Sequence, residues 1–237
     1  MILIIGYKGG MGRRYSAILD YLDVPWVGAD KEHSPDEILN IGLACTGVII
    51  ASPTNFHEDH LTLCAHLEVP VLCEKPFAKD LASVRRVLDL YSSHEHLSMV
   101  LQYYELIDPD KKGPSSYNYF RHGNDGIVWD CIQIVGLATD EVTLEETSPI
   151  WQCTLNGQEL NIKDMDEAYI RNVQRWLKGD YLGADTIYDI HRKTFEFEKR
   201  FPFAQSSHRY SGSLNIETVP RESFRRYLWK TNASVGD

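Results

Sequence analysis

The stretch "IIGYKGGMGRRY", residues 4–15, carries the strongest local signal for the fold of the first part of the chain. A short apolar run ends at Gly6, and glycine recurs at Gly9 and Gly12. Residues 10–22 then place apolar side chains at the spacing of one helix face. A strand, a glycine turn and a helix in this order let backbone N–H groups approach a pyrophosphate at the start of the helix. The pattern therefore predicts a nucleotide-binding unit.

The spacing of this loop is G-x-x-G-x-x-G, whereas the better-known fingerprint is G-x-G-x-x-G. Lys8 stands where the middle glycine of that fingerprint falls, and Gly9 and Gly10 supply the flexibility one residue later. A glycine-rich turn without a ligand is the alternative, and the flanking strand and helix favour nucleotide binding. The loop residues predicted to bind the cofactor are Gly6, Tyr7, Lys8, Gly9, Gly10, Met11 and Gly12.

Asp30 follows the second apolar run, at about the distance expected for the ribose-binding residue of a dinucleotide fold. A carboxylate there accepts hydrogen bonds from the adenosine ribose diol and repels a 2′-phosphate. Asp30 therefore favours NAD over NADP. The neighbouring Lys31 could pair with that phosphate, so both cofactors stay open. A turn residue that precedes a helix is the other interpretation of Asp30.

Strand-like and helix-like segments alternate over the first hundred residues, which predicts a parallel sheet covered on both faces. The rhythm changes after Tyr104, at the polar, turn-rich segment "DPDKKGPSS". We therefore expect an α/β protein with a Rossmann doubly wound domain in residues 1–104. Residues 105–237 are expected to form a smaller α+β domain with a hairpin at Asn156-Gly157 and a C-terminal tail.

Composition excludes several classes of protein. The net charge is −10 and Lys and Arg do not cluster, which argues against a nucleic-acid partner. The apolar opening is too short for a membrane-spanning helix or a signal segment. Five cysteines without a CxxC pair predict buried free thiols and a cytoplasmic protein. The nine histidines show no ligand spacing, so no metal site is expected.

A second motif, "CEKPFAKDL" at residues 73–81, places Glu74 and Lys75 directly after an apolar run. Residues 51–60, "ASPTNFHEDH", end the preceding strand. Ligands of parallel sheets bind past the carboxyl ends of the strands. We therefore expect Lys75 at a ligand mouth, within reach of a substrate hydroxyl or the nicotinamide ribose, and expect that the Lys75-Pro76 bond could be cis. A salt-bridged strand end is the alternative.

The glycine loop, "SPTNFH" and "CEKP", in this order and spacing, resemble the Gfo/Idh/MocA oxidoreductases over about the first hundred residues. The resemblance implies that Lys75 is the catalytic-site lysine and also contacts the cofactor. It implies an open, mostly antiparallel sheet in the second domain, used for substrate binding and for a homodimer or homotetramer. It further implies that Pro53, Asn55, His57 and Glu74 line the nicotinamide end of the cofactor. Ser52 and Thr54, in the same strand-end segment, complete the predicted cofactor-binding residues.

Members of that family carry an Asp and a His at the substrate, and the His commonly acts as acid and base. The segment "GNDGIVWDCIQIVGLA" aligns with this motif and places Asp130 at the Asp, whereas Ile134 falls on the His. Hydride transfer to or from an alcohol carbon needs a group that moves a proton. The candidates for catalysis are Lys75, Asp130 and Tyr104.

The sequence thus predicts an NAD(P)-dependent oxidoreductase that transfers a hydride between the nicotinamide and a small polar substrate, such as a sugar, a cyclitol or a nucleotide sugar. Biliverdin-reductase-like chemistry fits the missing histidine. A dihydrodipicolinate-reductase-like protein shares the glycine spacing, although its paired-histidine, lysine and "PSG" signature is absent. A non-catalytic NAD(H)-binding sensor or scaffold is the third alternative.

Overall fold

The computed structural model describes residues 1–91, 96–118, 127–145, 152–161 and 164–200. The chain divides into two compact units. The first unit contains Met1–Val100 and Val173–Tyr188, and the second contains Leu101–Asn172 and residues 189–200. Residues 173–188 therefore pack with the Rossmann-like unit although they come more than half-way along the chain.

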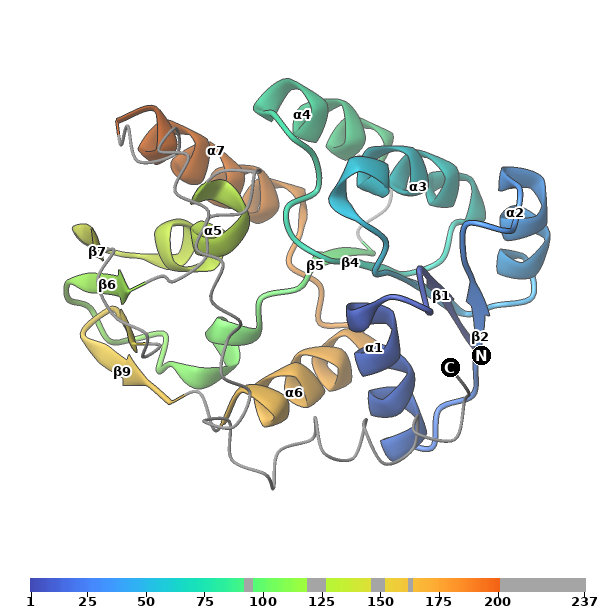
Figure 1. Ribbon diagram of the computed structural model, residues 1–237, viewed down its shortest axis with the longest axis horizontal. Helices are drawn as coiled ribbons and strands as arrows, with labels where there is room; N and C mark the ends of the chain where they lie inside the picture. Colours follow the sequence, from blue (N-terminus) through green and yellow to red (C-terminus); the bar gives the residue numbers. More distant parts are fainter. Residues whose placement is uncertain (92–95, 119–126, 146–151, 162–163, 201–237) are drawn as a thin grey trace, which may run out of the picture. The chain divides into compact units, whose positions relative to one another are not determined.

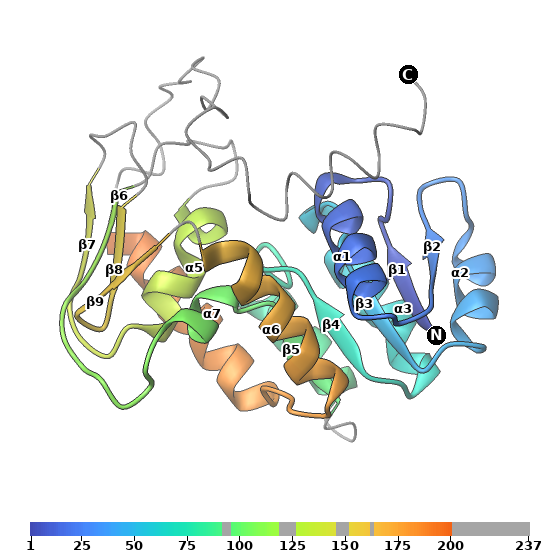
Figure 2. The same cartoon turned by 90° about the horizontal axis from the view of Figure 1, so that it is seen from below.

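The first unit is built on one five-stranded parallel sheet with the order β2-β1-β3-β4-β5 (Figures 1 and 2). Helices α2, α3 and α4 cover one face, and α1 covers the other. The strands are β1 (Ile2–Ile5), β2 (Trp26–Ala29), β3 (Gly47–Ile50), β4 (Val71–Cys73) and β5 (Leu97–Met99). The helices are α1 (Gly10–Tyr21), α2 (Pro35–Gly42), α3 (His57–Cys64) and α4 (Leu81–Leu90). This arrangement confirms the predicted Rossmann-like sheet.

The core of the first unit lies where helices cover both faces of the sheet. Every residue of β1 and β3 is buried, which explains why these strands read as continuous apolar runs rather than as alternating patterns. The last turn of α6 (Met165–Leu177) adds to this unit, because the ring of Trp176 lies against Gly47 in β3. A Cβ on Gly47 would stand 2.9 Å from that ring.

The second unit holds a four-stranded mixed sheet with the order β7-β6-β8-β9. β6 pairs with β7 in parallel, and the other two pairings are antiparallel, as the mostly antiparallel prediction requires. The hairpin at Asn156-Gly157 joins β8 to β9, with positive φ at both residues. The strands are β6 (Ser115–Asn118), β7 (Val142–Glu145), β8 (Gln152–Leu155) and β9 (Gln158–Leu160).

One face of this sheet packs on helix α5 (Ile127–Leu137) and helix α7 (Ala184–Arg200). The buried core includes Tyr117 from β6, Cys153 and Leu155 from β8, and Ile134 from α5. The neighbouring residues of the strands therefore point to the opposite face, because side chains alternate along a strand. A short 3₁₀ segment, η3 (Gln102–Leu106), opens the unit.

Candidate cofactor and catalytic site

The glycine turn after β1 is closed by backbone contacts that tolerate no side chain at two positions. Gly6 has a φ of +86°, and its N–H donates to the carbonyl oxygen of Ala29 at 2.7 Å. A Cβ on Gly6 would stand 2.7 Å from the Cα of Ser52. A Cβ on Gly12 would stand 2.1 Å from the carbonyl oxygen of Gly6. The first and third glycines therefore let α1 pack directly on the strand.

The middle of the loop is open. A Cβ on Gly10 would meet no atom within 4 Å, and one on Gly9 would meet only the carbonyl oxygen of Gly6, at 3.3 Å. Helix α1 begins here without a side-chain cap, and its first turn contains no acidic residue. The backbone N–H groups at such a start have no intrahelical partner and attract an anion. The loop thus has the open surface and the donors that a pyrophosphate requires.

Asp30 ties this loop to the end of β2. Its Oδ2 accepts the backbone N–H of Lys8 at 3.0 Å, and its Oδ1 accepts the backbone N–H of Lys31 at 2.8 Å. The backbone N–H of Asp30 donates to Nδ1 of His33 at 3.2 Å. The Asp30 carboxylate therefore stands beside the glycine loop, where the sequence expected a ribose-binding group.

The side chain of Lys8 forms an ion pair with Glu32, a residue that the sequence motifs did not single out. Their hydrogen bond raises the pKa of Lys8 and lowers that of Glu32, and both side chains are exposed. The Lys8 Nζ also lies 5.6 Å from the ring centroid of Tyr7. The signal for this ion pair in the sequence is the acidic residue Glu32, two positions after Asp30, which none of the motifs includes.

The end of β3 is organised by two histidines of α3. The His57 ring is 1% exposed, with Nε2 2.8 Å from the carbonyl oxygen of Ser52 and Nδ1 2.7 Å from that of Pro76. Burial lowers the pKa of His57 although both carbonyl oxygens act in the opposite direction. His60 Nδ1 lies 2.8 Å from the Ser52 hydroxyl. The predicted residues Thr54 and Asn55 lie in the 3₁₀ turn η1 (Thr54–Phe56), which leads into α3, and Pro53 directly precedes this turn.

The end of β4 carries the Glu74-Lys75 pair. Glu74 is 7% exposed, and its Oε1 accepts the hydroxyl of Tyr15 at 2.5 Å. Its Oε2 accepts the backbone N–H of Lys75 at 3.3 Å. The Lys75-Pro76 bond is cis, and the Lys75 side chain is half-buried. Glu74 thus contacts a tyrosine of α1 and the backbone of the turn itself.

The predicted cofactor residues are therefore gathered at the carboxyl ends of β1, β2, β3 and β4. The other catalytic candidates belong to the second unit. Tyr104 lies in η3 and is half-buried. Asp130 lies in helix α5, and its side chain is outside the described residues.

Ile134, at the position where the family motif has its histidine, is fully buried in the core of the second unit. Its neighbour Gln133 is also buried, and its side-chain oxygen accepts the backbone N–H of Tyr103 at 3.0 Å. Both residues therefore hold the helix on the rest of the unit. Neither side chain can transfer a proton near neutral pH.

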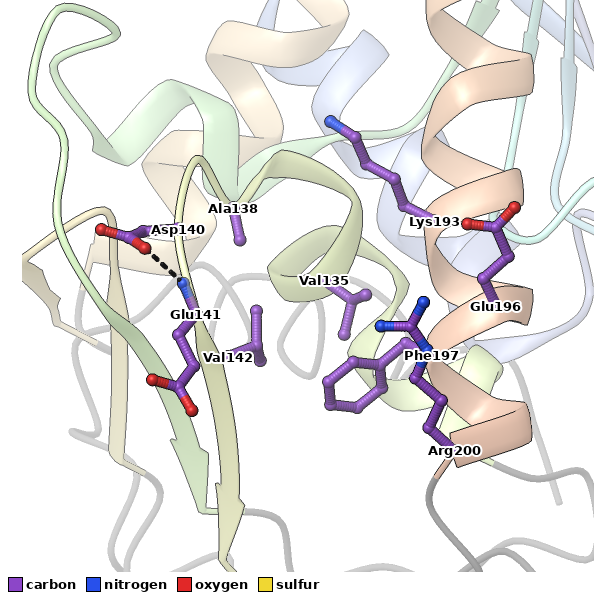
Figure 3. A pocket seen from close by; sticks show the side chains of 9 residues that line it. All are labelled: Val135, Ala138, Asp140, Glu141, Val142, Lys193, Glu196, Phe197 and Arg200. Carbon is purple, nitrogen blue, oxygen red and sulfur yellow. Dashed lines mark hydrogen bonds between the residues drawn. The ribbon is translucent and has the colours of Figure 1, made fainter.

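The second unit contains an open pocket of about 400 Å³ between α5, β7 and α7. Figure 3 shows Val135, Val142 and Phe197 turned toward one another there. Charged side chains from the start of β7 and from α7 complete the lining, among them Lys193 and Arg200. No residue predicted for cofactor binding or catalysis lines this pocket.

Membrane-spanning helices, groups of metal ligands and free thiols can each be examined among the described residues. In the described ranges no helix combines the length and apolar character needed to cross a membrane. Among the same residues, no three His, Cys, Asp or Glu side chains are grouped as metal ligands. The predicted free thiols are confirmed for four buried cysteines, Cys45, Cys64, Cys73 and Cys153.

Comparison with known proteins agrees with these features. Residues 17–102 match the model of the Gfo/Idh/MocA oxidoreductase family, NAD-binding Rossmann fold. No curated protein matches the chain in sequence. The WlbA (WbpB) dehydrogenase from Thermus thermophilus, solved in complex with NAD and UDP-GlcNAcA, superimposes with a TM-score of 0.66 at 12% identity, over 83% of this chain and 94% of that one.

Two further solved structures are similar. A myo-inositol dehydrogenase from Corynebacterium glutamicum gives a TM-score of 0.62 at 13% identity, over 84% of this chain and 96% of that one. A Gfo/Idh/MocA family oxidoreductase from Vibrio cholerae gives 0.63 at 13% identity, over 84% and 97%. Identities this low show a shared fold alone. The match of residues 17–102, together with this fold, confirms the resemblance to the Gfo/Idh/MocA oxidoreductases that the motifs indicate over the Rossmann domain.

Proposed function

We propose that this protein is an NAD(P)-dependent oxidoreductase that transfers a hydride between the nicotinamide and a small polar substrate. The observation that carries the proposal is the open glycine turn at the uncapped start of α1, on the same sheet edge as Lys75. The substrate class we propose is a sugar, a cyclitol or a nucleotide sugar. It is supported by two similar structures, a dehydrogenase solved in complex with UDP-GlcNAcA and a myo-inositol dehydrogenase.

The proposed cofactor is NAD. The backbone N–H groups of Gly10, Met11 and Gly12 would hold its pyrophosphate. Each oxygen of the Asp30 carboxylate accepts one backbone N–H, so lone pairs remain for the hydroxyls of the adenosine ribose. Glu32 supplies a second carboxylate beside this position, and two carboxylates disfavour the 2′-phosphate of NADP. Lys31 would lessen this preference, and so would Lys8 if it were released from Glu32.

In the proposed reaction the nicotinamide supplies or accepts the hydride. Lys75 would donate a hydrogen bond to the oxygen on the carbon that gains or loses the hydride, because an ammonium group is a donor with three N–H bonds. A group at that oxygen must also hold or move a proton. We propose Lys75 for this step, with Asp130 and Tyr104 as the further candidates.

A second function is favoured by one observation. Ile134 occupies the position of the family histidine and is fully buried, so the acid and base of that motif are missing. A protein that binds NAD(H) as a sensor or scaffold would need no such group. The family match favours both of these proposals over the biliverdin-reductase-like and dihydrodipicolinate-reductase-like alternatives.

We also propose a cytoplasmic location, consistent with the buried free thiols, and association of two or four copies through the sheet of the second unit. The face of this sheet away from the core carries a cross-strand row of small polar side chains, Thr143, Ser116 and Thr154. Light scattering after size-exclusion chromatography tests the assembly, and a monomer at micromolar concentration would contradict it.

The experiment that tests the function is a fluorescence titration with NADH and NADPH. We expect wild-type protein to bind NADH, Gly9→Val to lose binding while it stays folded, and Lys75→Ala to keep binding with an affinity lowered by about tenfold, the size of one hydrogen bond to a charged group. Gly9→Val is suitable because Gly9 has a φ of −71° and its Cβ would meet only the Gly6 carbonyl oxygen. Binding of neither cofactor by wild type would refute the proposal.

A polyol and nucleotide-sugar panel with NAD then separates the two functions. Turnover that is lost in Lys75→Ala supports the oxidoreductase. Binding without turnover of any panel member, together with unchanged binding in Lys75→Ala, would favour the sensor or scaffold.

A further inference from the structure

Two buried side chains, both remote in sequence from the turn, hold Glu74-Lys75-Pro76 at the end of β4. Tyr15 lies on α1, the helix whose first turn is the glycine loop, and it is fully buried. Its hydroxyl donates to Glu74 at 2.5 Å, and Glu74 in turn accepts the Lys75 backbone N–H. A buried carboxylate requires such donors, because burial without them is costly. Tyr15 therefore fixes the residue before Lys75.

His57 fixes the residue after Lys75. Its Nδ1 lies 2.7 Å from the carbonyl oxygen of Pro76, and its Nε2 lies 2.8 Å from that of Ser52. The ring thus bridges the ends of β3 and β4. Ser52 is itself held by its hydroxyl contact with His60. A neutral imidazole ring can donate a hydrogen bond to one of these two carbonyl oxygens only. Because the ring lies closely between the carbonyls of Ser52 and Pro76, it nevertheless sets the distance between them.

The two contacts leave Lys75 between a restrained residue on either side. Lys75 lies at the same edge of the sheet as the open glycine turn. The position of its backbone therefore limits where its ammonium group can reach. Misplacement of a reacting group by about 1 Å can cost roughly 100-fold in rate. We propose that Tyr15 and His57 are positioning residues that set the place of the Lys75 side chain and link it to the glycine-loop helix.

The effect of the Lys75 position on nicotinamide binding rests on the proposed function. The restraint of Lys75 by Tyr15 and His57 does not depend on that function. The competing explanation is that both side chains only stabilise the fold. A stabilising role alone would lower the melting temperature of the variants and leave the surroundings of Lys75 unchanged in the folded protein. The two explanations are therefore separated by a measurement on Lys75.

The variants are Tyr15→Phe, which removes only the hydroxyl, and His57→Gln and His57→Ala. Matched controls are Tyr21→Phe on the same helix and His66→Gln shortly after α3, since both native side chains are exposed. Trace acylation of folded protein, followed by mass spectrometry, gives the labelling rate of Lys75 relative to the exposed Lys79.

We expect this ratio to change severalfold in Tyr15→Phe and His57→Ala and to stay constant in both controls. His57→Gln, which keeps one donor, is expected to restore part of the wild-type ratio. An unchanged ratio in Tyr15→Phe and His57→Ala, with a lowered melting temperature, would show that the two residues serve stability only and would overturn the proposal.

A second readout uses NADH and ADP-ribose, which lacks the nicotinamide. We expect NADH affinity to fall about tenfold in Tyr15→Phe and His57→Ala, the size of one hydrogen bond to a charged group. ADP-ribose affinity should stay constant. Equal loss for both ligands would contradict a local role at the nicotinamide end. If wild type binds neither ligand, the proposed function fails, and the labelling ratio alone still decides the positioning role.

Discussion

Replacement of Gly12 by alanine probes the contact that closes the cofactor turn. The added Cβ would stand 2.1 Å from the carbonyl oxygen of Gly6 and 2.4 Å from the Cα of Tyr7. Both neighbours are backbone atoms, so no rotamer change relieves the contact. The turn and α1 must separate by about 1 Å, a distortion that belongs with overpacking costs of about 1–3 kcal/mol or more.

Alanine also favours the helix by about 1 kcal/mol over glycine, which offsets part of that cost. Because both neighbours are backbone atoms, we take the upper end of the overpacking range, about 3 kcal/mol, and expect a net loss of about 2 kcal/mol for Gly12→Ala. In a chain of this length that corresponds to a fall in melting temperature of roughly 4–8 °C. The Gly10→Ala variant is the matched control, because its Cβ would meet no atom within 4 Å. It should unfold at the wild-type temperature or slightly above it.

The assay is thermal unfolding followed by far-ultraviolet circular dichroism, with urea unfolding as a second measure. The reasoning is refuted if Gly12→Ala unfolds with wild-type protein, or if Gly10→Ala loses as much stability as Gly12→Ala. Either result would mean that the close approach of α1 to the turn is not what demands glycine there.

Three further predictions concern charge and burial. Burial lowers the pKa of His57, so the unfolded chain binds a proton on this ring more tightly than the folded protein does. The free energy of unfolding should therefore be highest above about pH 6.5 and should fall as the pH drops toward the folded-state pKa. The urea midpoints measured at about pH 7.5 and pH 5 should differ less in His57→Gln than in wild type. Glu32→Gln should raise the affinity for NADPH relative to NADH about fivefold, because Lys8 loses its partner carboxylate. Adding Lys8→Gln to the same variant should cancel the gain. An unchanged ratio of the two affinities in titrations would contradict a role of the Lys8–Glu32 pair in cofactor choice. Burial raises the pKa of Cys64 and of Cys153 to about 12. Iodoacetamide near pH 8 should therefore modify neither thiol until urea unfolds the protein. Rapid labelling of the folded protein would contradict the burial of these thiols.

Much of the Rossmann unit could be predicted because its signals are local. A continuous apolar run predicts a doubly covered strand such as β1, and glycine spacing predicts the turn, since each reflects the sterics of a few neighbouring residues. The hairpin at Asn156-Gly157 is predictable for the same reason, because both residues tolerate positive φ. The placement of Asp30 and Lys75 at strand ends follows from strand order in a parallel sheet.

The partners of these residues could not be predicted. Glu74 precedes Lys75 in the sequence, yet the structure gives its carboxylate the hydroxyl of Tyr15, 59 residues away. Lys8 likewise pairs with Glu32 rather than with the adjacent charges of the motif. A carboxylate accepts many kinds of donor, so its partner depends on which side chains the packing brings within about 3 Å.

The order of strands and helices in the first hundred residues, the glycine turn and the sheet edge at which the chemistry is expected can all be derived from the amino-acid sequence. The packing of Trp176 on Gly47, and the contacts by which Tyr15 and His57 hold the turn around Lys75, depend on the folded chain and are visible in its three-dimensional structure alone. The two kinds of interaction differ in how far apart along the sequence their partners lie. Backbone sterics and hydrophobic periodicity act between neighbours in sequence, whereas burial selects contacts among residues that are neighbours only after the chain has folded.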